Sequence, residues 1–257
     1  MNENQDICRI IEENLHNFYF RIAGKLQLDH RREPAPAFIR NDPGKWPSFV
    51  LGPSDPMEQE SILQEVAAGM GTGIYPPFWI TREPELADAF LENTLRYNIR
   101  PVSRWTGMSL EMDDYRTDPF MPRGAVIQTI SKDQGRDEWI DLVNREIFRR
   151  EALTGKMIAL MTGDNAFRLY SLTMERKMFS TALAFLDGEI AGLYFIATGA
   201  EQRKQGFGKA VTAHAIKDCF QQGARRVVLH ATSAGEPLYR NLGFKPYCHF
   251  DILWYFA

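Results

Sequence analysis

A chain of 257 residues can bury a sizeable hydrophobic core, in one large domain or in two modest ones. Its composition, 44% hydrophobic and 25% charged with a formal net charge of −3, is that of an ordinary globular protein and gives no sign of a nucleic-acid-binding surface. No apolar run reaches the roughly 18 residues of a membrane-spanning helix. We therefore expect neither a nucleic acid nor a membrane as a partner.

The cysteines and the N-terminus indicate the compartment. Cys8, Cys219 and Cys248 are few, odd in number and far apart, which is typical of reduced thiols rather than of a disulfide framework. Residues 1–6 are polar and acidic, unlike a signal peptide. We expect a cytoplasmic protein. Because no metal-ligand spacing occurs among its cysteines and histidines, we also expect no metal.

Helices and strands alternate irregularly in the first 112 residues. Apolar positions on one face predict a first helix over residues 6–25, and residues 34–56 are rich in Pro and Gly, so we expect them to be mostly irregular. The further elements predicted here are a strand at 48–51, a helix at 57–68, a strand at 76–80, a helix at 84–97 and a strand at 102–112. The cluster Gly69-Met-Gly-Thr-Gly73 contains no Lys or Arg, so we interpret it as a turn that ends the helix rather than as a phosphate loop.

The second half of the chain has clearer periodicities. Residues 113–123, which contain Pro119 and Pro122, form the expected linker. The pattern then predicts, in order, a strand at 124–130, helices at 133–150 and 156–163, a hairpin of strands at 167–174 and 178–186, a strand at 190–198, a helix at 210–222, a strand at 226–231 and a short helix closed by Gly243.

Residues 201–211 carry the strongest functional signal. They follow an apolar strand and open a helix, and Gly206 and Gly208 stand one residue apart. A strand, a glycine-rich turn and a helix start form an anion cradle, because glycine lets the backbone approach a ligand and free N–H groups point at it. Positive charge around the same turn comes from Arg203, Lys204 and Lys209. The segment predicts a phosphate-bearing ligand.

Residue spacing excludes two common nucleotide loops. A Walker A loop needs a Ser or Thr hydroxyl where this chain has Ala210, and the dinucleotide fingerprint needs a third glycine where it has Val211. The pattern that fits is Arg/Gln-x-x-Gly-x-Gly/Ala, at residues 203–208. It resembles the acetyl-CoA pyrophosphate loop of the GCN5-related N-acetyltransferases (GNAT).

A second motif strengthens the resemblance. Leu238-Tyr-Arg-Asn-Leu-Gly-Phe244 is similar to the family's signature for a short helix that places a tyrosine beside the thioester sulfur. The two motifs occur in the family's order, with a helix and a strand between them. The resemblance covers about residues 124–257 and implies the family's α/β (α+β) fold, a mixed, mostly antiparallel central sheet flanked by helices.

The resemblance further implies two GNAT-like halves. Residues 123–257 would be the acetyl-CoA-binding domain. In residues 1–115, the strand, helix and strand predicted between 76 and 112 resemble the last third of an acetyltransferase unit. We therefore expect a degenerate second copy there, without the pyrophosphate signature, as in tandem members of the family.

Acetyl-CoA is the cosubstrate that the resemblance implies, with no metal. The loop backbone would bind its pyrophosphate, and the strand before the loop would pair with its pantetheine arm. The cofactor-binding residues expected on this basis are Ile196, Ala197, Thr198, Arg203, Lys204, Gln205, Gly206, Phe207, Gly208, Lys209 and Thr232. Thr232 stands where many members have Asn, and its hydroxyl replaces only part of that hydrogen bonding.

Tyr239 matches the family's general-acid tyrosine by its place in the second motif. A phenol with a pKa of about 10 is suited to protonating a departing thiolate. The alternative is a half-buried tyrosine that only packs. The general base is open: His230, at the end of a strand, could take a proton at neutral pH, and so could a base acting through ordered water.

The expected function is transfer of an acetyl group from acetyl-CoA to a primary amine of a small molecule or a peptide. A non-catalytic module that binds or senses acyl-CoA is the alternative, because it would keep the loop but would not need Tyr239. We expect a monomer or a homodimer.

Overall fold

The computed structural model describes residues 3–34, 36–52, 56–82, 87–115, 121–131 and 135–257. They form two compact units: unit 1 comprises Met1–Gly107, Ala231–Ala234 and Pro246–Ala257, and unit 2 comprises Met108–His230 and Gly235–Lys245. The units are not consecutive halves of the sequence, because the C-terminal strand pairs with a strand of the N-terminal part.

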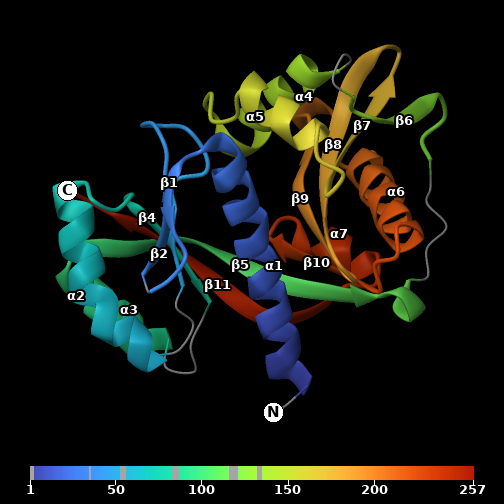
Figure 1. The fold of residues 1–257 in the computed structure, drawn as a ribbon. Coiled ribbons are helices and arrows are strands. Elements are labelled where there is room, and N and C mark those ends of the chain that lie inside the picture. Colours follow the sequence, from blue (N-terminus) through green and yellow to red (C-terminus); the bar gives the residue numbers. More distant parts are fainter. Residues whose placement is uncertain (1–2, 35, 53–55, 83–86, 116–120, 132–134) are drawn as a thin grey trace. The chain divides into compact units, whose positions relative to one another are not determined.

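Unit 1 is a mixed sheet with helices. Its elements are α1 (Glu3–Leu26), β1 (Asp29–Arg31), β2 (Ala37–Arg40), β3 (Phe49–Leu51), α2 (Pro56–Thr72), β4 (Phe78–Arg82), α3 (Ala87–Arg96) and most of β5 (Ile99–Glu111) and β11 (Lys245–Tyr255). The strand order is β1-β2-β3-β4-β11-β5, with β3 and β4 parallel and the pairs β1–β2, β2–β3 and β4–β11 antiparallel. Helices α2 and α3 lie side by side (Figure 1).

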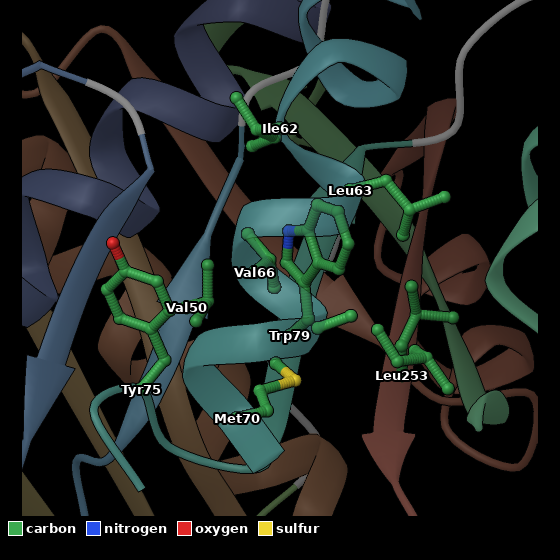
Figure 2. Packing of buried hydrophobic residues seen from close by; sticks show 10 residues of the cluster. Val50, Ile62, Leu63, Val66, Met70, Tyr75, Trp79 and Leu253 are labelled. Atoms are coloured by element: carbon green, nitrogen blue, oxygen red, sulfur yellow. The ribbon is translucent and has the colours of Figure 1, made fainter. Parts of the chain in front are cut away.

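The core of unit 1 forms where α2 packs on strands β3, β4 and β11 (Figure 2). Trp79 is fully buried at its centre, between Val66 of α2 and Leu253 of β11. The indole N–H donates to the Gly52 carbonyl at 2.7 Å, so burying this ring leaves no polar atom unpaired.

We predicted that the helix ends at Gly69 and that residues 69–73 form a turn. This prediction is wrong for residues 69–72, because α2 continues to Thr72. Two glycines are needed inside the helix for close packing. A Cβ on Gly69 would lie 2.1 Å from Cδ2 of Tyr75, and one on Gly71 would lie 3.0 Å from the Tyr255 hydroxyl. These glycines therefore give aromatic side chains room against the helix rather than ending it.

Unit 2 also combines parallel and antiparallel strands with helices. Its elements are β6 (Ala125–Thr129), α4 (Arg136–Val143), the π-helical turn η2 (Asn144–Phe148), α5 (Gly155–Thr162), β7 (Phe167–Met174), β8 (Lys177–Asp187), β9 (Ile190–Thr198), η3 (Ala200–Gln202), α6 (Phe207–Gln221), β10 (Arg226–Ala231) and α7 (Glu236–Asn241). Strand order is β10-β9-β8-β7-β6, and only β9 and β10 are parallel. Helix α6 covers one face of β7–β9, and α4 and α5 cover the other (Figure 1).

The predicted mixed and mostly antiparallel architecture is confirmed, and most elements of residues 124–257 lie where the periodicity predicted them. The sequence did not predict two short strands, β1 and β2. Strand β2 lies in the segment whose proline and glycine content led us to expect irregular structure. The single helix predicted at 133–150 is α4 followed by η2. The predicted helix start at Pro84 and the middle of the predicted linker lie outside the described residues. The degenerate copy in residues 1–115 stays a prediction.

Among the helices of the described ranges, none combines the length and the apolar character that crossing a membrane requires.

Candidate active site

Strands β9 and β10 separate at one end of their ladder. They pair in parallel from Ile190–Arg226 to Leu193–Leu229. Strand β9 then runs on to Thr198, while β10 runs on to Ala231, so the last residues of both strands lie beyond their shared ladder. The last residues of β9, including Ile196, Ala197 and Thr198, therefore lie beyond its ladder with β10, although the Ala197 carbonyl accepts from Ser180 and the Thr198 carbonyl from Arg203.

A bulge accompanies this separation. On the other side of β9, Ala197 pairs with Thr181 but Tyr194 pairs with Leu183, so the two residues Phe195 and Ile196 face one residue of β8. Phe195 has a φ of +48°, which lies in the left-handed region. Such a bulge twists the strand and shifts the side chains after it to the opposite face.

Beyond β9, residues 203–209 form a glycine-rich turn that we call the anion loop. Lys204 and Gly206 take positive φ values of 62° and 86°, and α6 begins at Phe207. The first intrahelical bond runs from the Ala210 N–H to the Gly206 carbonyl at 2.9 Å. The N–H groups of the first helical residues, up to Lys209, therefore point out of the helix end, where the helix dipole favours an anion.

Close packing fixes the anion loop on β9. A Cβ on Gly208 would lie 3.0 Å from Oγ1 of Thr198, so the helix start lies close against the strand end. The Phe207 ring is buried and packs edge-on against Phe179 of β8, with ring centroids 5.1 Å apart. The loop is thus held close to the end of β9.

The charged side chains of the loop lie in different surroundings. Arg203 donates from Nε to the Thr198 carbonyl at 3.3 Å, and its Nη2 lies 2.7 Å from Oε2 of Glu146. Lys204 is exposed and Lys209 is half-buried, while the exposed Gln205 amide donates to the Glu201 carbonyl at 3.0 Å. The loop therefore offers two lysines to an anion, whereas its arginine already has an acidic partner.

The acidic partner comes from η2, which the sequence analysis missed. One side of this π-helical turn contacts the bulge, because the Phe148 and Phe195 rings lie 6.0 Å apart. The Asn144 side-chain oxygen closes the turn by accepting from the N–H groups of Ala152 and Leu153. Single π turns are frequent at functional sites, and the position of η2 beside the bulge and the anion loop is consistent with a site there. The change from α-helix to π-helical turn cannot be predicted from the amphipathic pattern, because both have apolar residues on one side.

Tyr239 lies on α7, which approaches the start of α6. The Leu238 side chain is 3.6 Å from the position that a Cβ on Gly208 would take. Tyr239 is half-buried, its ring packs edge-on against Phe244, and burial raises the pKa of its phenol above the usual value. Gly243 ends the helix with a φ of +102°, as the motif predicted.

The other predicted residues have different positions. Thr232 is exposed and belongs to unit 1. His230 is half-buried, one residue beyond the β9–β10 ladder. His214 is half-buried on α6 and packs edge-on against Tyr170. The structure thus brings β9, the anion loop and α7 together within unit 2.

No group of three or more His, Cys, Asp or Glu side chains that could hold a metal ion occurs within the described ranges, and the expectation that no metal is required stays a prediction.

Solved structures share this fold. A GCN5-related N-acetyltransferase from Kribbella flavida is 15% identical, with 92% of this chain and 93% of that chain covered and a TM-score of 0.67. A functionally unknown conserved protein from Staphylococcus epidermidis is 12% identical over 90% and 95% of the two chains, with a TM-score of 0.65. A GCN5-related N-acetyltransferase from Sphaerobacter thermophilus is 17% identical over 77% and 69%, with a TM-score of 0.61. At these identities the likeness shows the fold.

No curated protein matches the sequence. The sequence model of the Acetyltransferase (GNAT) family matches residues 129–244, a segment that contains β7 to α7 together with the anion loop and Tyr239. This family and fold support acyl transfer in general. Residues 129–244 therefore match the model of the GNAT acetyltransferase family.

Proposed function

We propose that this protein transfers an acetyl group from acetyl-CoA to a primary amine of a small molecule or a peptide. The observation that carries the proposal is the end of β9, beyond its ladder with β10, next to the anion loop. A linear ligand with a phosphate group at one end and amide groups along its arm matches an anion site that continues into the end of a strand beyond its ladder.

The residues that would hold acetyl-CoA follow from this geometry. N–H groups at the start of α6 and the Lys204 and Lys209 ammonium groups would bind the pyrophosphate. The backbone of Ile196, Ala197 and Thr198 would pair with the pantetheine arm and orient the carbonyl group. Acetyl-CoA itself, when bound, supplies an activated thioester.

Tyr239 is the proposed proton donor to the leaving sulfur. Its phenol must be protonated to act as an acid, and the raised pKa keeps it neutral at every pH at which a free tyrosine is neutral. Tyr239→Phe removes the proton and keeps the ring, so the packing against Phe244 is retained. An enzyme of this kind should lose about a hundredfold or more in turnover, the usual contribution of a general acid, with little change in CoA affinity.

The test combines binding and turnover in the full-length protein. Thermal shifts with CoA and acetyl-CoA report binding to the folded state, and release of free thiol across a panel of primary amines reports transfer. If CoA raises the unfolding temperature but no amine releases thiol, the non-catalytic acyl-CoA-binding module is the better description. If CoA produces no shift, neither function holds. The monomer or homodimer state and the cytoplasmic location remain part of the proposal.

A further inference from the structure

Two buried hydroxyl groups lie on β8 opposite the bulge in β9. Ser180 and Thr181 are both fully buried, in a strand whose next four residues, from Ala182 to Phe185, are apolar. Hydroxyl groups in such a strand must find partners, because an unpaired buried polar group is costly. Their partners are carbonyl groups of β9 at the bulge and just after it.

Each hydroxyl donates to one carbonyl of β9. Thr181 Oγ1 donates to the carbonyl of Phe195, the bulge residue, at 3.0 Å. Ser180 Oγ donates to the carbonyl of Ala197 at 2.7 Å and lies 2.9 Å from Oγ1 of Thr198. These bonds satisfy carbonyls at and just after the point where the regular ladder is interrupted.

The bulge is therefore supported by side chains and not by backbone pairing alone. Without a bulge, β9 would return to a regular ladder with β8, and every side chain after Tyr194 would change face. Thr198 would then leave its position against Gly208, where the anion loop starts its helix. By bonding to β9 carbonyls, the two hydroxyls stabilise the register of β9 in which Thr198 lies against the anion loop.

We propose that Ser180 and Thr181 are positioning residues that hold the β9 bulge, so that the strand backbone and the anion loop present one continuous surface to acetyl-CoA. The inference rests on the proposed function, because the pantetheine arm is the ligand that this backbone would pair with. Neither residue belongs to the two motifs that mark the family resemblance.

The experiment separates the hydroxyl from the shape of the side chain. Thr181→Val keeps the shape and removes the hydroxyl, whereas Thr181→Ser keeps the hydroxyl and removes a methyl group. Ser180→Ala removes the second hydroxyl. Thr173→Val is the matched control, since Thr173 lies on β7 and its hydroxyl makes an exposed bond to the Val126 carbonyl at 3.4 Å.

Binding of CoA is measured by calorimetry, and kcat and KM for acetyl-CoA by thiol release, at a temperature well below each variant's unfolding midpoint. Because each variant removes a side-chain donor from a β9 carbonyl, Thr181→Val and Ser180→Ala should each weaken CoA binding and lower kcat by about tenfold. Thr181→Ser should stay near wild type, and Thr173→Val should be unchanged.

The outcomes distinguish the two proposals. If wild type binds CoA but Thr181→Val and Ser180→Ala behave like the Thr173→Val control, the positioning role is wrong and the proposed function stands. If Thr181→Ser loses binding while Thr181→Val keeps it, the residue only fills space, which also overturns the inference. If wild type itself binds no CoA, the proposed function fails and the positioning role fails with it.

Discussion

The Arg203 guanidinium forms an ion pair with the Glu146 carboxylate, Nη2 to Oε2 at 2.7 Å, and this pair joins the anion loop to the π-helical turn η2. The Glu146 side chain is only 9% exposed and also lies 3.0 Å from Nε of Arg145. A negative charge beside a loop that would bind phosphate groups lowers the loop's attraction for them.

Glu146→Gln should therefore strengthen CoA binding. Removing one negative charge near the phosphates and releasing Arg203 should lower the dissociation constant about threefold to tenfold at low salt, with a smaller gain at high salt because ions screen the interaction. Calorimetric titration at two salt concentrations measures the effect. Glu189→Gln is the control, since Glu189 pairs with Arg225 on the exposed surface before β9. Weaker binding by Glu146→Gln would show that the ion pair orients the loop for the ligand instead.

Gly206 should be essential for the loop. Its φ of +86° costs an L-amino acid about 1–2 kcal/mol, so Gly206→Ala should bend the start of α6 and weaken CoA binding more than tenfold. Gly223→Ala provides a matched backbone penalty, because Gly223 has a φ of +98° just after the other end of the same helix. Both variants should unfold at lower denaturant concentrations, and only the first should lose CoA binding. Equal CoA binding by both would mean that the loop conformation is not required.

Gly69 should be required for packing in unit 1. Gly69→Ala places a Cβ against the Tyr75 ring, and overpacking of this kind costs about 1–3 kcal/mol of unfolding free energy. Gly24→Ala is the helical control, since nothing lies within 4 Å of a Cβ there. It should stabilise the protein by about 0.5–1 kcal/mol, the difference in helix propensity. Urea unfolding measures both changes, and a neutral Gly69→Ala would contradict the packing that the structure shows.

Among the three cysteines, Cys8 should react with an alkylating reagent at the lowest pH. A hydrogen bond with the Cys248 side chain and the charge of Arg82 outweigh burial and lower the pKa of Cys8 to about 7. The thiolate is the reactive form, so the rate with iodoacetamide should rise through a midpoint near pH 7. Burial raises the pKa of Cys219, which should stay unmodified in the folded protein. Peptide mapping by mass spectrometry follows each site, and a Cys8 midpoint near that of a free thiol would contradict the prediction.

Local sequence determined the anion loop and the motif around Tyr239. Positive φ at Gly206 and Gly243, and the helix that starts at Phe207, depend on residues a few positions apart, so their spacing is readable in the sequence. The strands of unit 2 were predictable for the same reason, because runs such as β8 and β9 are mostly apolar.

Tertiary structure alone decided the bulge at Phe195, the ion pair of Glu146 and the helical course of α2 through Gly69. Strand register depends on the neighbouring strand, so the partners of Ser180 and Thr181 are set by the pairing of β8 with β9 and not by their own sequence. Likewise, Gly69 has the local character of a helix stop, but the Tyr75 ring fills the space that a side chain would occupy. The sequence by itself thus determined the glycine positions of the loop and predicted its ligand chemistry, whereas packing between distant segments decided how the strand beside it is shaped.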